Sequence, residues 1–220
     1  MSEGKEVPTK PKGHKTRYKT KDNVLSIETT CDDNSELFDD QKGESFPDVT
    51  IDLPNCSENL SLHRVILSKA SQGLGTVFRG KPTFWCTYNA QSRHLAWKTH
   101  CDSDVEGSVL KKWLHFCYGS EMYLTIYEAV AGLWTLMQLK LRQEEELGLI
   151  IKQFIAPEVP RNVEIEVQVL KQCIAYGKDC DQAYDTLIAT LAERVLSRDN
   201  ITNNFDLVVD HCLMELPPSF

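Results

Sequence analysis

Between residues 48 and 78 the spacing of apolar residues changes from that of a strand to that of a helix. Apolar and polar residues alternate over 49–53 and again over 60–62, which is typical of half-buried strands. Over 65–78 the apolar residues recur at three- and four-residue spacing, as on a helix buried on one face. Two glycines disfavour one long helix there, so we expect two short helices that meet near Ser71.

Helical spacing dominates the remainder of the chain. Apolar residues recur with the period of a helix in six further segments, 108–118, 127–139, 144–155, 163–176, 181–197 and 204–215. Two shorter stretches, 94–98 and 122–124, are predicted to be extended. Pro157 and Pro160 separate the last three helices from those before them. The pattern therefore predicts an α+β unit followed by an all-α extension.

Residues 1–45 are predicted to be a disordered tail, because they bury too little apolar surface to offset the entropy of ordering. The first part of this tail is rich in lysine and the second part is acidic. The basic part is interpreted either as a nuclear-import or acidic-partner segment or as a solvated extension. Residues 35–41 have the spacing of one or two helical turns.

Composition narrows the function classes. The chain has 24 Lys and Arg against 32 Asp and Glu, which gives a net charge of −8. This composition argues against general nucleic-acid binding, because such binding requires a basic face. No run approaches the roughly 18 apolar residues needed to span a bilayer, and the polar N-terminus does not resemble a signal peptide. We therefore expect a cytoplasmic or nuclear protein with no membrane partner, whose eight scattered cysteines stay reduced.

The sequence contains no pattern typical of a catalytic, cofactor-binding or metal-binding site, so we expect a protein that is not an enzyme. The best zinc candidate consists of Cys86, His94, His100 and Cys101, and its spacings fit no standard site. The two glycines within 73–75 lack the lysine of a phosphate-binding loop and are interpreted as a helix junction.

The motifs DVTIDL, SLHRVILSKAS and VF occur in the order of the opening of a BTB/POZ domain, which this chain resembles. The matching positions are Asp48, Val49, Leu62, His63, Arg64, Ile66, Leu67, Ser71, Val77 and Phe78. The later segment GSVLKKWLHFCYGSEMYLT resembles a helix and strand of the same family. The resemblance implies a BTB/POZ fold over 46–156, with a small mixed sheet flanked by helical hairpins. The helices over 162–220 resemble the start of the BACK region of kelch-like adaptors, without kelch repeats.

Residues 79–107 fit this family least well. The link between the paired helices and the next helix is longer than in kelch-like relatives, and Pro82 opposes regular structure, so we expect a loop insertion over the sheet edge. The insertion carries Phe84, Trp85 and Tyr88, which are candidates for contact with a partner. The alternative is that these aromatic residues pack within the insertion.

The resemblance also implies a charged pocket near the dimer interface, formed by Asp48 and Arg64. A carboxylate that leaves water needs a cation able to bind it with two hydrogen bonds, and arginine is suited to this. The alternative is that Arg64 is a solvated surface charge. His63 is predicted to be a buried ring satisfied by backbone groups.

The family resemblance implies a protein–protein interaction adaptor that forms a dimer and links a client to a cullin-type ubiquitin ligase scaffold. Kelch-like adaptors contact the cullin through an apolar-x-Glu motif after the position of Phe78, and no Glu occurs here between Phe78 and Glu106. The helices that follow favour cullin binding, since they extend the cullin groove in relatives. The alternative is a BTB dimerisation or corepressor-type scaffold without cullin binding.

Overall fold

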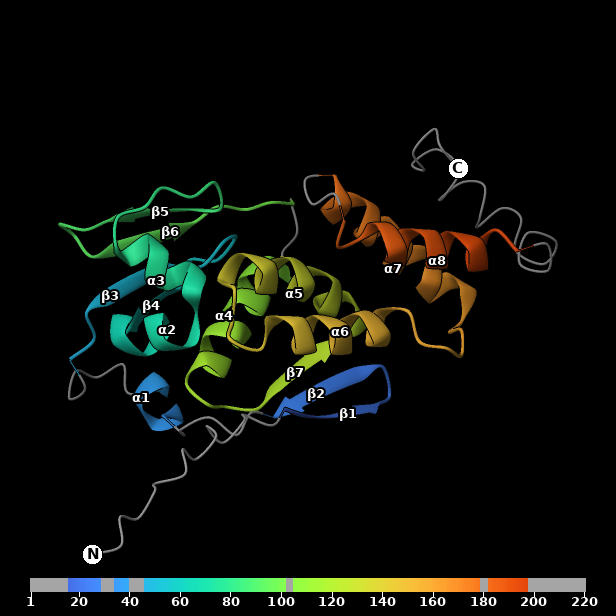
Figure 1. Ribbon diagram of the computed structural model, residues 1–220, viewed down its shortest axis with the longest axis horizontal. Helices are drawn as coiled ribbons and strands as arrows, with labels where there is room; N and C mark the ends of the chain where they lie inside the picture. Colours follow the sequence, from blue (N-terminus) through green and yellow to red (C-terminus); the bar gives the residue numbers. More distant parts are fainter. Residues whose placement is uncertain (1–15, 29–33, 40–45, 102–104, 179–181, 198–220) are drawn as a thin grey trace, which may run out of the picture.

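The computed structural model describes residues 16–28, 34–39, 46–101, 105–178 and 182–197, in which helices lie between two small sheets (Figure 1). In chain order the elements are β1 (Arg17–Lys21), β2 (Val24–Glu28), α1 (Ser35–Asp39), β3 (Val49–Asp52), β4 (Asn59–Leu62), α2 (Arg64–Ala70), α3 (Gln72–Phe78), β5 (Cys86–Asn89), β6 (His94–Trp97), α4 (Val105–Cys117), β7 (Met122–Thr125), α5 (Ile126–Leu139), α6 (Glu144–Ile155), α7 (Val163–Gly177) and α8 (Asp185–Val195). The central helix is α5, which is buried along most of its length and packs against α4, α6 and α7. This arrangement confirms the predicted α+β fold.

The four-stranded sheet has the order β4-β3-β6-β5 and is mixed. Strand β3 pairs antiparallel with β4 and parallel with β6. Ile51 lies in register with Leu60 on one side and Leu95 on the other, so the buried residues of the three strands share one face. The predicted strand pair and the predicted strand at 94–98 are therefore confirmed.

The fourth strand of this sheet corrects the sequence interpretation. Residues 86–89, predicted to belong to a loop insertion, form the edge strand β5, which pairs antiparallel with β6. Cys86 and Tyr88 alternate with more exposed residues. Cys86 lies opposite Trp97, and Tyr88 lies opposite Leu95. The alternation covers only this short strand and closely follows a proline, which is why its signal in the sequence is weak.

Helices α2 and α3 are the two short helices predicted, and they meet at Ser71. Ser71 has an extended backbone and caps α3, since its Oγ accepts the N–H of Leu74 at 3.0 Å. A Cβ atom at Gly73 would lie 2.7 Å from the carbonyl oxygen of Leu139 and closer still to that of Gln138. Only glycine therefore allows α3 to approach the C-terminal end of α5 this closely.

The N-terminal part of the chain requires a second correction. Residues 17–28, predicted to be disordered, form the β1–β2 hairpin, and β2 pairs with β7 in a three-stranded antiparallel sheet. Leu25 and Ile27 are fully buried, and Asp22 and Asn23 both have positive φ, as a type I′ turn requires. The helical turn predicted within 35–41 is α1. The remainder of the predicted tail lies outside the described residues, apart from Thr16 and Asn34.

Helices α7 and α8 continue the helical part of the molecule beyond α5 and α6 (Figure 1). The Tyr184 hydroxyl donates to the Val130 carbonyl oxygen at 2.7 Å, which joins the start of α8 to α5. These two helices correspond to those predicted over 163–176 and 181–197, although α8 begins at Asp185. The helix predicted over 204–215 lies outside the described residues.

Candidate functional site

Asp48 and Arg64, the residues of the expected charged pocket, are in contact. Asp48 directly precedes β3, and Arg64 is the first residue of α2. The Arg64 Nε–H donates to Asp48 Oδ2 at 2.9 Å, and the Arg64 backbone N–H donates to Asp48 Oδ1 at 2.7 Å. The two side chains are only 36% and 34% exposed. One guanidinium donor and one backbone donor thus hold the carboxylate, in place of the guanidinium fork that the sequence suggested.

These contacts lower the pKa of the Asp48 carboxyl. Partial burial alone would raise this pKa, but the hydrogen bonds from the Arg64 backbone and guanidinium, together with the charge of Arg64, outweigh it. The pKa of Arg64 is raised by its hydrogen bonds to Asp48 and Tyr88. Asp48 is therefore ionised at neutral pH, and its negative charge lies at the N-terminus of α2, where it is stabilising.

His63 is buried next to this pair, against Tyr118 at the end of α4. Its backbone N–H donates to the Tyr118 hydroxyl at 2.7 Å, and its ring Nδ1 lies 3.1 Å from the same oxygen. The ring is buried as predicted, and its Nδ1 contacts a side-chain hydroxyl. Burial raises the pKa of Tyr118, so this hydroxyl stays protonated.

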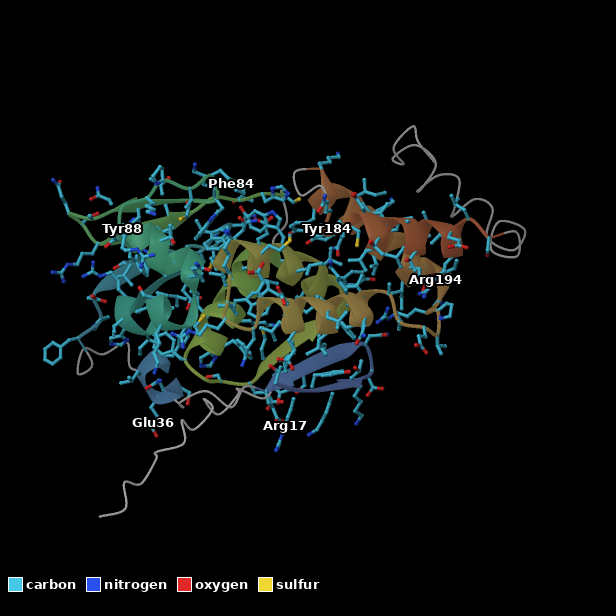
Figure 2. The ribbon with its side chains drawn as sticks, in the orientation of Figure 1. Arg17, Glu36, Phe84, Tyr88, Tyr184 and Arg194 are labelled. Atoms are coloured by element: carbon cyan, nitrogen blue, oxygen red, sulfur yellow. The ribbon has the colours of Figure 1, made fainter. Side chains whose placement is uncertain are left out.

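The three aromatic residues predicted as partner contacts have different environments. Phe84 is 69% exposed and lies beside β5 at the surface (Figure 2). Tyr88 is half-buried: its ring packs against Phe78, and its hydroxyl accepts from Arg64 Nη1 at 3.3 Å. Trp85 is 6% exposed and packs against the tryptophan of β6, with ring centroids 4.7 Å apart. Trp85 is thus a core residue, and its assignment as a partner contact is wrong.

An apolar groove of about 460 Å³ lies beside α2. It is bounded by α2, the end of α4 and the loop between α5 and α6. Its lining includes Val65, Ile66, Phe116 and Leu141, together with two cations, Lys69 and Arg142. Val65 is 76% exposed although it is apolar. A groove of this composition suits apolar side chains presented by another protein.

The fold forms this groove by joining the α2–α3 junction to the loop after α5. Ser71 forms a β-bridge with Leu141, and its hydroxyl donates to the Leu139 carbonyl. The Gln72 N–H donates to the Lys140 carbonyl at 3.0 Å. Lys140 ends α5 in the left-handed conformation, with φ of 49°, and this turn brings Leu141 beside α2.

The described residues give little support to metal or thiol chemistry. No three His, Cys, Asp or Glu side chains among them are placed to hold one metal ion. In the zinc candidate, His94 Nε2 lies 3.0 Å from Asp52, and His100 stacks on Trp134. Burial raises the pKa of the Cys86 thiol to about 11, which disfavours the reactive thiolate. Each described helix is too short or too polar to cross a bilayer.

Sequence reasoning found part of this site. It identified Asp48, Arg64 and Tyr88, which the structure joins in one chain of contacts. It missed the hydroxyl role of Tyr118, for which the only signal was the Phe-Cys-Tyr-Gly motif, and it missed the groove. The groove depends on a contact between Ser71 and the loop after α5, and no local pattern encodes such a distant contact.

Comparison with protein-family models matches residues 37–143 to the BTB/POZ domain. No match is found among curated proteins or among solved structures. The matched range begins within α1, includes the charged pair, His63 and the groove residues of α2, α4 and the loop between α5 and α6, and ends just before α6. A BTB/POZ domain at these residues agrees with the family that the sequence resembles and with the α+β architecture.

Proposed function

We propose, from the BTB/POZ domain at residues 37–143, that the protein is a self-associating interaction adaptor. BTB/POZ domains bind other proteins, commonly self-associate and are generally not enzymes. The observation that carries the proposal is the apolar groove beside α2, with Val65 largely exposed at its wall. An exposed apolar surface around a groove marks a place where another protein binds.

The surface around the groove carries charges of both signs, which suits a two-fold dimer. Lys69 and Arg142 line the groove, whereas the short helix α1 next to it is acidic. Glu36 of α1 is exposed and points away from the body of the molecule (Figure 2). In a two-fold contact, α1 of one copy can therefore lie against the groove of the other.

Light scattering of the full chain tests self-association. We expect a dimer mass at tens of micromolar, and Val65→Glu should shift it to the monomer, because the variant places a charge in an apolar contact. Leu149→Glu is the matched control, since Leu149 is 59% exposed but lies on α6, away from the groove. A monomeric wild type, or equal masses for both variants, would contradict the proposal.

Cullin binding is the second part of the proposal, and the exposure of Phe84 supports it. Phe84 follows α3 at the sheet edge, the region in which kelch-like adaptors carry their cullin motif, although the glutamate of that motif has no counterpart here. We propose that α7 and α8 begin a BACK-like region that extends the same surface. The whole would then link a client to a cullin-type scaffold.

Capture by an immobilised cullin N-terminal domain separates this function from its alternative. Phe84→Ala should abolish capture, whereas Tyr123→Ala, at another exposed aromatic residue on β7, should preserve it. A dimer that the cullin domain does not capture would favour the alternative, a dimerisation or corepressor-type scaffold.

A further inference from the structure

Strand β1 has an open edge. Among the described strands it has a neighbour only on the β2 side, and all of its residues are exposed. The two-residue turn makes Lys21 and Val24 a hydrogen-bonded pair. Because the two kinds of pair alternate along the hairpin, Thr20 with Leu25 and Tyr18 with Ile27 are non-hydrogen-bonded pairs. The backbone N–H and C=O groups of Tyr18 and Thr20 therefore point away from β2, toward the open edge.

Contacts near both ends hold this edge in place. Thr16 Oγ1 donates to Glu146 Oε2 on α6 at 3.0 Å, and Arg161 Nε donates to Asn23 Oδ1 in the hairpin turn at 3.1 Å. Arg161 is fixed in turn, because its Nη1 donates to the Ile155 carbonyl oxygen at 2.9 Å. An edge that is ordered in advance loses less entropy when it binds a partner.

Cations line one face of this edge. Alternate residues of β1 are cations: Arg17, Lys19 and Lys21. They pair with the half-buried residues of β2 and not with the fully buried ones, so the three cations lie on the outer face of the sheet. Arg17 projects from the margin of the molecule (Figure 2). Lys19 Nζ is 3.8 Å from Glu28, in an ion pair that is exposed and therefore weak.

We propose that the edge of β1 binds an extended acidic segment of a partner protein by β-strand addition. Acidic residues at alternate positions of the added strand lie opposite Arg17, Lys19 and Lys21, with the two strands about 4.8 Å apart. The intervening residues of the added strand lie on the opposite face of the sheet, the face of Tyr18, which is 52% exposed. These intervening residues are apolar or β-branched. The recognised motif is thus acid-x-acid-x-acid in an extended conformation.

The same charges argue against a second copy of this chain as the occupant. Two β1 edges placed side by side would bring like charges together, and lysine on an edge strand protects against such pairing. The proposal is also independent of the self-association proposed above, since that contact uses the groove beside α2.

Fluorescence anisotropy with the full chain and labelled peptides tests strand addition without altering the protein. We expect a peptide with alternating Glu and Val to bind and its counterpart with Lys in place of Glu not to bind. A peptide with the same charges and a central proline in place of valine should bind at least about tenfold more weakly, because it cannot form the ladder. Equal binding with and without the proline would show charge attraction alone and overturn the proposal.

Variants of β1 provide the second test. Thr20→Pro removes an outward N–H and no bond to β2, so the peptide should bind at least about tenfold more weakly, whereas Thr20→Ala keeps the N–H and should bind normally. If the Thr20→Pro protein does not fold, the test of strand addition rests on Thr20→Ala and on the peptide series. Wild-type affinity in a folded Thr20→Pro protein would overturn the proposal. A dimer that Thr20→Pro dissociates would place a second copy at the edge and overturn it as well.

The role of charge has its own matched pair of variants. Replacing the three cations of β1 with Glu should abolish peptide binding. The same change at Arg79, Lys81 and Lys98, which follow α3 and β6 and are exposed, alters the net charge equally and should preserve binding. Equal effects of the two triple variants would show that only net charge matters and would overturn the proposed site.

Discussion

The hydroxyl of Tyr176 on α7 donates to Oε1 of Glu106 on α4 at 3.2 Å. Glu106 is buried, and its carboxylate also accepts the backbone N–H groups of His100 at 3.0 Å and Cys101 at 2.7 Å. A buried carboxylate needs such donors, because an interior charge without them is costly. Helix α7 therefore supplies a donor to a buried carboxyl group within residues 37–143, the range matched to the BTB/POZ domain, and the two parts should unfold together.

Removing this hydroxyl should destabilise the whole protein. Tyr176→Phe leaves the carboxylate with one donor fewer, and we expect a loss of about 1–3 kcal/mol in the free energy of unfolding. Tyr184→Phe is the matched control, since its hydroxyl donates to an uncharged carbonyl, and it should cost about 0.5–1.5 kcal/mol. Urea denaturation followed by circular dichroism measures both. Two separate transitions in the wild type would contradict the joint unfolding.

The two glycines of α3 should respond in opposite ways to replacement by alanine. At Gly73 the added Cβ would collide with backbone carbonyls at the end of α5, so we expect a loss of about 1–3 kcal/mol. At Gly75 the nearest atom would be 3.5 Å away, an ordinary contact, and alanine should be neutral or stabilise by up to about 1 kcal/mol. Thermal melting of the two variants checks this, and a stable Gly73→Ala protein would contradict the close approach seen here.

Most of the elements that the sequence predicted have apolar spacing that is long or repeated. The strand pair β3–β4, the helices α2 to α6 and the break at Ser71 all follow from such spacing. The β1–β2 hairpin was missed because its buried residues are only Leu25 and Ile27 and its turn is Asp-Asn, a weaker signal than Asn-Gly. Pairing with the distant strand β7 is what makes so short a pattern stable.

The parts of the candidate site that could be predicted are the charged residues that lie within a recognisable sequence motif. Asp48 and Arg64 were identified, but the backbone donor of Arg64 was not, since it depends on how α2 begins beside β3. Trp85 and Phe84 are adjacent in the sequence, and only the structure shows that one is buried and the other exposed. Both residues precede β5, so the alternation within that strand does not distinguish them.

The contribution of Asp48 to stability should depend on pH. The pKa of Asp48 is lower in the folded protein than its ordinary value of 3.8, so the unfolded chain takes up the proton first as the pH falls. Its stabilisation is then complete above about pH 5 and is lost as the pH falls through the folded-state pKa. At pH 7 Asp48→Asn should cost about 0.5–1.5 kcal/mol, and the difference from wild type should shrink below about pH 4.

Unfolding free energies measured from neutral to acidic pH test this dependence, and Arg64→Met supplies the control. The Arg64 guanidinium accounts for only part of the lowered pKa of Asp48, since the backbone N–H of residue 64 still donates in Arg64→Met; the pH-dependent difference should therefore shrink but not vanish when Arg64→Met is the background for Asp48→Asn. A difference that grows on acidification would contradict the assigned direction of the shift.

Replacing the two adjacent aromatic residues before β5, one at a time, should distinguish an effect on stability from an effect on partner binding. Trp85→Ala removes a core ring that packs against Trp97, and we expect a loss of about 3–5 kcal/mol in the free energy of unfolding. Phe84→Ala removes an exposed ring and should change stability by less than about 0.5 kcal/mol. Only Phe84→Ala is therefore a valid probe of a partner at this edge, because loss of binding in a Trp85 variant would follow from unfolding. Thermal melts of the two variants decide the matter, and a stable Trp85→Ala protein would show that this ring is not part of the core.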